Sequence, residues 1–563
     1  MPLTEIRDLL LGGDAAGALA RLNPLVARHP GEPECRYWLA SALAALGARE
    51  AASEAMSNAI TLHALTAARE MNADLAAAQS DGAYANRVAT TLYGNNCVAM
   101  ASVFWGMAIS ADHVDANTLV SYGLSLQHQG RIEEAIQVFR AAAETFPSPG
   151  VGQFLLFPHV FADGGDRRFA DEARAWSKRY APSGPPPRFA NPPSAGRKLR
   201  IGYVAPDFSG SQLRQFVAPL FENHDPDAVE VFLYPADAAT EAGWPAWVKV
   251  HAIGKLNDAQ AVRLIRSHRI DVLNDLWGHT AGSRLPVFAL RAAPVQAGWI
   301  NFAQTTGLDE MDYVLHATSE GLPHARRDYT EKVWPIGPAF TAFRPAACRA
   351  EPTPTPALRE GRVTFGSFNH PSKLSDGCVA AWAAAMRRTP GSRLLLKYRY
   401  YADAVLRRTT QARFGAHGIA PERIAFQGHS AGAEYLAAFG EMDLALDAWP
   451  APGSTTTLEA LSNGVPVLVL AGPELTLGGL YARSIVQAAG LDELVATDPD
   501  DFVEKAVALA ADPQALDALR ARVRPGFDAG PCCDEAGFTR RLEDEYRAMF
   551  DAWAARSRSA SAA

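Results

Sequence analysis

The sequence has few lysines, few cysteines and no long apolar run. Only eight of its 53 basic residues are lysines, and its six cysteines are spread over 563 residues without a CxxC pair. That cysteine pattern differs from a disulfide scaffold, and the vicinal Cys532 and Cys533 are interpreted as two ordinary thiols. No stretch reaches the roughly 18 to 20 unbroken apolar residues that cross a bilayer, so we expect no membrane span.

A negative net charge narrows the classes of protein further. The net charge of −8 and the isoelectric point near 6.0 argue against a general nucleic-acid binder. Apolar residues at 48% and charged residues at 20% exclude a mostly disordered chain. The N-terminus, MPLTEIRDLL, lacks the basic and apolar regions of a secretory signal, so we expect a cytoplasmic protein without a nucleic-acid partner.

The first 150 residues are rich in Ala and Leu with helical apolar spacing, and they contain a repeat. Two copies carry Gly, Ala and Pro at offsets 0, 5 and 17: Gly13, Ala18 and Pro30, then Gly130, Ala135 and Pro147. Gly94 with Ala99 is interpreted as the start of a further copy that lacks the Pro. A small residue at a tight turn, an Ala at a close helix crossing and a terminating Pro resemble the tetratricopeptide repeat (TPR), a helical solenoid. An ordinary helical bundle is the alternative.

The chain is expected to divide into four segments. Residues 1–180 are predicted to be a TPR-like helical repeat domain, and residues 181–198 a Pro-rich linker around PSGPPPRFANPP. From residue 199 onward apolar strand-like runs alternate with amphipathic helices, which predicts parallel sheets with helices on both faces. Residues 199–345 and 362–555 are therefore predicted to be an N-terminal and a C-terminal Rossmann-like lobe, an arrangement that typically binds a nucleotide-containing ligand.

Individual elements are predicted within these segments. Helices are expected at 97–109, 258–267, 376–388, 456–463 and 538–554, and strands within 199–208, 229–236, 269–279, 363–369, 392–398, 424–428, 444–450 and 465–471. The last helix is expected to cross back over the first lobe, and residues 555–563 to be frayed.

One loop stands out for its chemistry. The sequence has neither GxGxxG nor GxxxxGK[ST], so NAD-dependent enzymes and P-loop NTPases lose support. After a strand expected to end at Trp449, the run APGSTTTLEALSNGVPV is a Gly/Ser/Thr-rich loop that opens a helix. The N–H groups and dipole of such a helix start suit a phosphate, the hydroxyls of Thr455 and Thr456 add donors, and Glu459 can accept from ribose hydroxyls. An ordinary Ser/Thr N-cap on a buried helix explains the same spacing equally well.

Four motifs resemble those of a known family. DLWGHTAGSRLPVFALRAAPVQAGW (275–299), TTGLDEMDYVL (305–315), FGSFNHPSK (365–373) and DAWPAPGSTTTLEALSNGVPV (447–467) resemble the catalytic region of the O-GlcNAc transferase and SPINDLY protein glycosyltransferases. The resemblance spans residues 199–555 and implies a GT-B core behind TPR repeats. It implies inverting, metal-independent transfer of a sugar from a nucleotide sugar to Ser or Thr of an acceptor protein bound through the repeats. The nucleotide sugar is a co-substrate, and no cofactor is implied.

The resemblance assigns catalytic roles to two residues. Lys373 matches the lysine that holds the donor diphosphate, where an ammonium neutralises charge as the glycosidic bond breaks. His279 matches a family histidine at a strand end that faces the cleft, and a structural His in a GHT turn is the alternative.

The resemblance also assigns donor-binding residues. Asn369 and His370 precede Lys373 in one loop and are expected near the sugar or the phosphates. The pair Thr455 and Thr456 matches the threonines that bind diphosphate, Glu459 matches the acid on ribose, and Ser454 stands where the family has a histidine.

Several departures from the family pattern leave the substrates open. Two family histidines are absent from the run 209–215, the segment 301–304 differs, and Gly432 and Tyr435 replace basic residues that face the donor base. The donor base and sugar, the acceptor, the general base and the oligomeric state are therefore not fixed, although UDP-GlcNAc is the family's donor. The alternatives are a bacterial flagellin glycosyltransferase that uses another activated sugar such as a nonulosonate, and a non-catalytic TPR scaffold.

The repeats lack any acid/base cluster, so they are expected to select the acceptor and to perform no chemistry. A chain that starts near Phe189 is accordingly expected to keep its nucleotide affinity.

Overall fold

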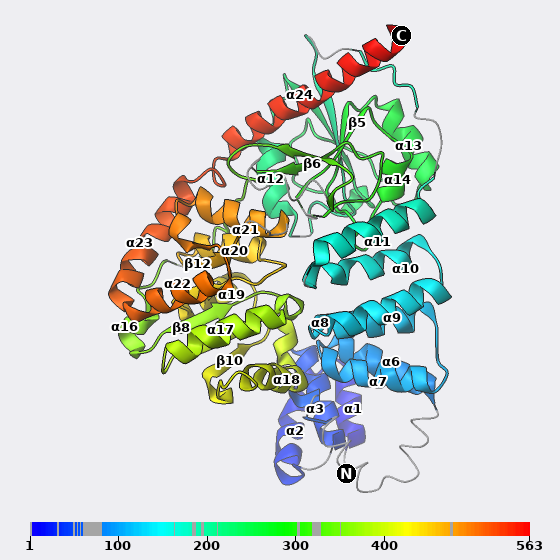
Figure 1. Ribbon diagram of the computed structural model, residues 1–563. Helices are drawn as coiled ribbons and strands as arrows, with labels where there is room; N and C mark the ends of the chain where they lie inside the picture. Colours follow the sequence, from blue (N-terminus) through cyan, green and yellow to red (C-terminus); the bar gives the residue numbers. More distant parts are fainter. Residues whose placement is uncertain are drawn as a thin grey trace. The chain divides into compact units, whose positions relative to one another are not determined.

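The chain packs into two compact units in this computed structural model (Figure 1). Unit 1 consists of Met1–Pro147 and Thr364–Tyr435, and unit 2 of Ser148–Val363 and Leu436–Ala563. The structure describes residues 3–30, 33–48, 51–52, 54–56, 58–59, 81–162, 164–182, 187–192, 196–210, 212–300, 304–317, 328–349, 351–472 and 477–562.

The first part of unit 1 is a series of helical hairpins. Its helices are α1 (Leu3–Leu11), α2 (Ala15–Arg28), α3 (Pro33–Ala45), α6 (Gly82–Gly94), α7 (Val98–Ser110), α8 (Ala116–His128) and α9 (Ile132–Thr145). Gly13 and Gly130 sit in the turns before α2 and α9 with φ of 84° and 79°, a conformation that strains residues with a side chain. Ala18 and Ala135 have no exposed surface, as close helix crossings require. The TPR-like pattern of these two copies is confirmed.

The third copy lies two residues later than predicted. Gly94 ends α6, and the left-handed turn residue before α7 is Asn96, with φ of 64°. Counting five residues from Asn96 reaches Ala101, which has no exposed surface, rather than Ala99. Asn tolerates the left-handed region better than most residues, so it takes the place that Gly holds in the other two copies.

The second part of unit 1 is three parallel strands with their helices. The strands β8 (Thr364–Ser367), β9 (Arg393–Lys397) and β10 (Ile424–Gln427) lie in the order β10-β9-β8. They are joined through η4 (Pro371–Lys373), α17 (Asp376–Arg388), η5 (Arg399–Ala402), α18 (Ala404–Gly415) and η6 (Pro421–Arg423), and α19 (Gly432–Ala437) follows. The helix predicted at 376–388 is α17 to the residue, because the Ser375 hydroxyl accepts from the Cys378 N–H and fixes its start.

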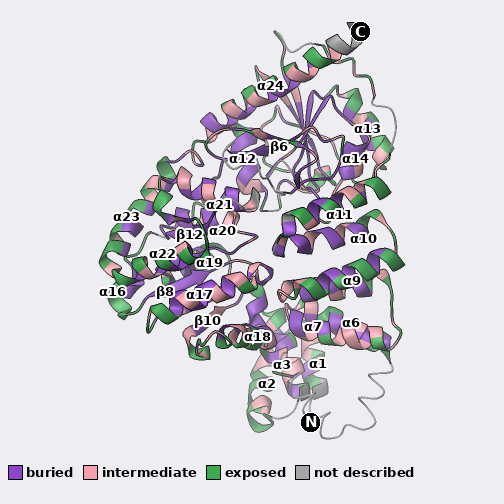
Figure 2. Ribbon diagram, viewed as in Figure 1, coloured by how far each residue is buried: buried purple, intermediate pink, exposed green. Residues whose placement is uncertain are grey.

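Unit 2 contains a seven-stranded parallel sheet of order β3-β2-β1-β4-β5-β6-β7. Its strands are β1 (Leu199–Val204), β2 (Val229–Tyr234), β3 (Lys249–Val250), β4 (Val272–Asp275), β5 (Val295–Gly298), β6 (Tyr313–His316) and β7 (Lys332–Pro335), with α12 (Arg214–Asn223), η2 (Ala238–Thr240), α13 (Asp258–Ser267) and α14 (Leu285–Ala289) between them. Most strand residues are buried (Figure 2). The strand order reverses between β1 and β4, and ligands of open parallel sheets bind outside the carboxyl ends at such a switch point.

Two helices before the linker pack onto this sheet. Helix α10 (Pro149–Leu156), η1 (Phe157–Phe161) and α11 (Gly165–Tyr180) contribute Leu156, Phe169 and Trp176 to the same buried cluster as Leu273 and Phe288. The last helices of the predicted repeat domain therefore share the core of the first sheet. The residue limits of the four predicted segments stay predictions.

The remainder of unit 2 holds three further parallel strands and the C-terminal helices. The strands β11 (Leu444–Leu446), β12 (Val467–Leu470) and β13 (Val495–Ala496) are neighbours in that order. The helices are α16 (Pro356–Glu360), η7 (Ala438–Glu441), α20 (Thr455–Ser462), α21 (Leu477–Ala488), η8 (Asp492–Leu494), α22 (Pro499–Ala511), α23 (Pro513–Ala529) and α24 (Glu535–Ala562).

The last helix crosses the first sheet, as predicted. In α24 the ring of Phe538 stacks on Trp299, and Glu543 Oε1 lies 2.7 Å from Nδ1 of His224. The prediction of a frayed end over 555–563 is wrong for the described part, because α24 continues to Ala562. Within the described ranges no helix, α24 included, is both long and apolar enough to cross a membrane.

The strand predicted over 444–450 is shorter than expected. It ends at Leu446 because the next side chain, Asp447, accepts the N–H groups of Ala448 and Gly453 at 2.8 and 2.7 Å. Those two bonds turn the chain out of the sheet before it reaches Trp449.

Candidate functional site

The turn before α20 is held by one buried carboxylate. Asp447 is 2% exposed and, besides the two N–H groups, accepts from the Thr457 hydroxyl at 3.1 Å. A Cβ at Gly453 would collide with the hydroxyl oxygens of Thr456 and Thr457, so any other residue would displace these side chains. The loop therefore has a defined shape that aims the start of α20.

The start of α20 carries the predicted donor-binding residues. The helix begins at Thr455, so Thr455 and Thr456 are its first two residues and Glu459 lies one turn further on. The Ser454 side chain stands at the N-cap and makes no capping hydrogen bond to the described residues of its helix. An ordinary Ser N-cap would make that bond. Phosphate binding at this helix start stays a prediction.

The loop after β8 carries Asn369, His370 and Lys373. The Asn369 side chain donates to the Ser367 hydroxyl at 3.3 Å, and His370 Nδ1 accepts the Ser372 N–H at 3.0 Å. The Lys373 N–H bonds the His370 carbonyl at 2.9 Å, which closes the short helix η4. These bonds fold five residues into one compact loop at the carboxyl end of β8, and Lys373 is its half-buried end.

His370 is neutral in this loop. Burial, the neighbouring His128 ring and the Lys373 ammonium together hold its pKa well below the ordinary value. Because a backbone N–H can only donate, Nδ1 is the acceptor nitrogen and the ring hydrogen lies on Nε2. His370 can therefore offer an N–H donor to an anionic ligand.

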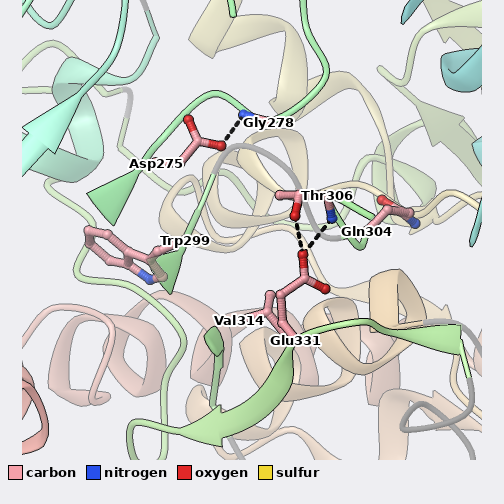
Figure 3. Close-up of a pocket in the computed structure, with 8 residues that line it drawn as sticks. Asp275, Gly278, Trp299, Gln304, Thr306, Val314 and Glu331 are labelled. Carbon is pink, nitrogen blue, oxygen red and sulfur yellow. Dashed lines mark hydrogen bonds between the residues drawn. The ribbon is translucent and has the colours of Figure 1, made fainter. Parts of the chain in front are cut away.

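A small pocket lies where β4 and β5 of the first sheet end, beside β6 and the start of β7 (Figure 3). Its lining residues are Asp275, Gly278, Gly298, Trp299, Gln304, Thr306, Val314 and Glu331. Figure 3 shows Glu331 receiving two hydrogen bonds from Thr306, one from the N–H at 2.6 Å and one from the hydroxyl. Thr305 adds a third bond through its own hydroxyl at 2.6 Å, so the TTG segment is fastened to Glu331.

Two buried acids in this pocket were not predicted as site residues. Burial raises the pKa of Asp275 to about 6, against the N–H donors of Gly278 and Trp277 that lower it, and Glu331 raises it further. Burial likewise raises the pKa of Glu331. A carboxylate with a pKa near 6 can exchange a proton near neutral pH. The sequence signal was available, because Asp275 ends an apolar strand at what proves to be the switch point.

His279 lies just beyond β4, in the predicted region, and is 2% exposed. Its Nε2 donates to the Thr306 carbonyl at 2.8 Å, and Trp176 and Phe169 of α11 pack edge-on against its ring. Burial lowers its pKa to about 4, so the ring is neutral. These contacts favour the structural alternative, in which His279 supports the TTG segment, and its catalytic role stays a prediction.

The structure groups the predicted residues in three places. Asn369, His370 and Lys373 share the η4 loop of unit 1; Ser454, Thr455, Thr456 and Glu459 share the first turns of α20 in unit 2; His279 stands beside the pocket of the first sheet. Convergence of the three groups on one donor stays a prediction.

A family model matches most of this core. The match to Glycosyl transferase family 41 covers residues 184–341 and 354–535, which include the strands β1 to β13 and all the predicted site residues. The four-motif resemblance is thereby confirmed.

Similar proteins agree with the family match. The chain is 31% identical over 414 residues to the protein named "Probable UDP-N-acetylglucosamine--peptide N-acetylglucosaminyltransferase SPINDLY" of Hordeum vulgare, covering 70% of this chain and 43% of that protein. It is 30% identical over 435 residues to the SPINDLY protein of Oryza sativa subsp. japonica, covering 74% and 46%. The chain thus spans less than half the length of these curated relatives.

A solved structure matches nearly the whole chain. A mutant O-GlcNAc transferase of Thermobaculum terrenum superposes with a TM-score of 0.74 at 26% identity, covering 99% of this chain and 98% of that one. The predicted class, a TPR-like helical region followed by a GT-B core of two Rossmann-like sheets, is confirmed. The fold, the motifs and the relatives agree that the chain belongs to glycosyl transferase family 41, the family of the O-GlcNAc transferase and SPINDLY proteins.

Proposed function

We propose that this chain is a protein O-glycosyltransferase that transfers GlcNAc from UDP-GlcNAc to Ser or Thr hydroxyls of acceptor proteins. The observation that carries the proposal is the family match across both Rossmann-like sheets, together with the relatives' printed name, UDP-N-acetylglucosamine–peptide N-acetylglucosaminyltransferase. The shape of the α20 turn supports it independently, because Asp447 and Gly453 present a helix start suited to phosphate.

The proposed step is a single displacement at the anomeric carbon of the donor sugar. The acceptor hydroxyl oxygen bonds to that carbon, its proton passes to a base, and the bond to the diphosphate breaks with its electron pair on the diphosphate. Attack from the face opposite the leaving group inverts the configuration. The nucleoside diphosphate gains negative charge during the step, so cationic and N–H donors around it lower the barrier.

Within this proposal, residues of two loops together bind the leaving diphosphate. Lys373 supplies an ammonium, His370 an Nε2–H, and Thr455 and Thr456 supply hydroxyls at a positive helix end. Asn369, Ser454 and Glu459 complete the donor contacts, with Glu459 toward the ribose. The Lys373 charge is the reason for proposing a metal-independent reaction, and the nucleotide sugar is a co-substrate rather than a cofactor.

The acceptor belongs to the same proposal. The helical hairpins of unit 1 resemble modules that bind other proteins, so we assign them the acceptor protein. A cytoplasmic location and flagellin as an acceptor are further predictions of this kind. A donor with another base, as a flagellin enzyme using a nonulosonate would need, is compatible with Gly432 and Tyr435 at the base-facing positions.

Thermal shift with three nucleotides tests the donor. UDP is expected to raise the unfolding midpoint in a concentration-dependent way, and GDP and CMP to leave it unchanged. A response to CMP alone would favour the flagellin alternative. A protein that responds to UDP but transfers no sugar to any acceptor would be the non-catalytic scaffold.

A further inference from the structure

The helical repeats of unit 1 pack directly on the η4 loop. Five rings form the contact, which we call the His128 cluster: Tyr93 of α6, His128 of α8, His370 of the loop, and Tyr398 and Tyr400 around η5. The ring of His128 stacks on Tyr400 with centroids 4.8 Å apart and lies 4.9 Å from the ring of His370. The ring of Tyr398 packs edge-on against His370, with centroids 4.6 Å apart. His370 thus contacts rings from both the repeats and the strand region.

Tyr93 fixes His128 within this cluster. The Tyr93 hydroxyl lies 2.8 Å from Nε2 of His128, and the two rings stack with centroids 5.7 Å apart. Burial and the nearby Arg399 lower the pKa of His128 to about 3, so this ring is neutral near pH 7. The charged groups that face the cluster are the Arg399 guanidinium, 4.9 Å over the Tyr400 ring, and the Lys373 ammonium. Near neutral pH the two histidines therefore act by packing and hydrogen bonding rather than by charge.

The backbone of the loop also rests on the repeats. The Ser372 hydroxyl lies 2.7 Å from the carbonyl oxygen of Gln127 in the last turn of α8, and the Ser372 side chain is buried. At the turn between α8 and α9, a Cβ on Gly130 would come within 3.4 Å of the Pro371 carbonyl oxygen. The glycine that marks the repeat in the sequence therefore also lies beside the loop, where a side chain would have little room.

A buried carboxylate also connects the repeats to the strand region of unit 1. Asp403 has no exposed surface, and its Oδ2 accepts the N–H of Ala99 in the first turn of α7 at 2.8 Å. Its Oδ1 accepts the N–H of Val405 at 2.8 Å and so caps α18. One side chain thus caps a repeat helix and a helix of the strand region, which lie side by side (Figure 1).

From these contacts we infer that Tyr93 and His128 are positioning residues for the loop 369–373, so that the repeats help to set how this loop holds a nucleoside diphosphate. The inference rests on the proposed function, because the loop's ligand is the leaving diphosphate. It adds a role for the repeats in the donor half of the reaction, besides any role in binding the acceptor.

The expected effect follows from how precisely a catalytic charge must be placed. A charge that stabilises a leaving group must be held within a fraction of an ångström, and that requires supporting contacts on the loop that carries it. The loop gains such support from Gln127 and His128. A looser loop samples geometries in which the ammonium is out of place, so apparent affinity for the nucleotide falls.

The test compares matched tyrosine variants in the full-length protein. Tyr93→Phe removes only the hydroxyl that reaches His128, whereas Tyr84→Phe removes an exposed hydroxyl on the same helix α6. We expect Tyr93→Phe to raise the Kd for UDP and the KM for the nucleotide sugar about 3- to 10-fold, as loss of one hydrogen bond allows. Tyr84→Phe is expected to match wild type, and the KM for a short peptide acceptor is expected to stay unchanged in both.

A second pair of variants separates positioning from general stability. His128→Ala removes a ring from the stack, and we expect at least a 10-fold loss of UDP affinity; His128→Phe restores a ring of similar shape and is expected to recover most of it. Hydrogen exchange of the loop backbone, measured without nucleotide, is expected to quicken in His128→Ala and Tyr93→Phe and not in Tyr84→Phe.

The outcomes distinguish this inference from the proposed function. If wild type binds UDP and Lys373→Ala does not, while Tyr93→Phe and His128→Ala bind and exchange like wild type, the positioning role is overturned and the function stands. If wild type binds no nucleotide, the proposed function fails, and the exchange data still decide whether the repeats order the loop. A variant that lowers the unfolding midpoint but leaves KM and exchange unchanged would make the cluster purely structural.

Discussion

At the scale of single residues, buried carboxylates fix the backbone conformation of several turns. Asp447, Asp403 and Asp275 each accept backbone N–H groups in places with little access to water. Such a bond is worth roughly 1.5 to 3 kcal/mol, and leaving the buried N–H unpaired costs a similar amount. Each of these acids fixes the turn that follows a strand or precedes a helix.

Asp275 gives a pH-dependent prediction. Its pKa rises from 3.8 to about 6 on folding, so the folded protein holds the proton more tightly than the unfolded chain does. The resulting loss of stability is absent below about pH 4, accumulates up to about pH 6 and is constant above it. Asn cannot ionise, so the unfolding free energy of Asp275→Asn should rise relative to wild type by about 3 kcal/mol between pH 4 and pH 7. Urea unfolding across that range measures the difference, and a difference that does not vary with pH would contradict the burial of a charged Asp275.

The sequence predicts the site residues that belong to a recognisable motif. It does not predict which side chains pack around them. Lys373 and the Thr455–Thr456 pair followed from their motifs, and the structure places the pair at a helix start as expected. Glu331 could not be predicted, because its partners Thr305 and Thr306 lie 26 and 25 residues away in the sequence and meet it only through the pairing of β6 with β7. The packing of His279 against Trp176 depends on a helix about 100 residues earlier in the chain, which no local pattern reveals.

At the scale of elements, α20 is the helix on which turnover should depend most. Replacing Thr455 and Thr456 together with Val keeps the branched shape and removes two hydroxyl donors from a charge that grows in the transition state. We expect turnover to fall roughly 100-fold or more, with a much smaller change in UDP affinity. Steady-state kinetics and direct UDP binding measure the two effects.

A matched control exists on another helix. Thr90 and Thr91 are an adjacent, exposed pair in α6 whose hydroxyls bond backbone carbonyls one turn earlier. The same double change to Val there should leave both turnover and affinity unaltered. If wild type and the two double variants had equal kinetics, the α20 loop would be an ordinary helix start with no role in binding phosphate.

Helix capping by Asp403 gives the second prediction at this scale. Asp403→Ala leaves N–H groups of both α7 and α18 without their acceptor in a buried place, so we expect a loss of roughly 2 to 4 kcal/mol in unfolding free energy. Asp115→Ala removes the cap of α8 alone, at an exposed site, and should cost about 1 kcal/mol. Denaturant unfolding of both variants makes the comparison, and equal losses would contradict the double cap.

The ends of helices and strands could be predicted where residues close to them in the sequence determine them. Helix α13 matches the prediction to the residue because Asn257 and Gln260 form a reciprocal capping box at its start. The third repeat was misplaced by two residues because the turn uses Asn96, whereas the pattern sought a glycine. Strand β11 was overextended because its apolar run continues past Asp447, whose side chain ends the pairing.

At the scale of the whole molecule, the repeats are part of the architecture of unit 1. From the sequence we expect a chain starting near Phe189 to keep its nucleotide affinity, because the repeats contain no acid/base cluster. The packing of the repeats on the η4 loop and on Asp403 predicts the opposite. Periodicity identifies a solenoid but does not reveal what its helices pack against, which is why the sequence could not foresee this.

The truncated chain therefore provides a prediction. Starting the chain near Phe189 exposes the rings around His370 and leaves Asp403 with one helix to cap, so the product should bind UDP at least 10-fold more weakly than full-length protein. The same truncation removes Phe169 and Trp176 from the core of the first sheet, so the product should also unfold at a lower temperature. Thermal unfolding and UDP titration of both proteins provide the comparison. A stable truncated protein with full UDP affinity would show that the repeats serve only the acceptor.

Sugar transfer itself is the decisive measurement for the proposed function. Intact-mass measurement of an acceptor protein incubated with UDP-GlcNAc and the full-length chain should show added GlcNAc on Ser or Thr, and EDTA should not reduce it. Lys373→Ala should fold normally and give no detectable product, since losing one charge-assisted contact to the diphosphate costs about 2 to 4 kcal/mol. Transfer by Lys373→Ala at the wild-type rate, or no transfer by wild type to any acceptor that it binds, would contradict the account.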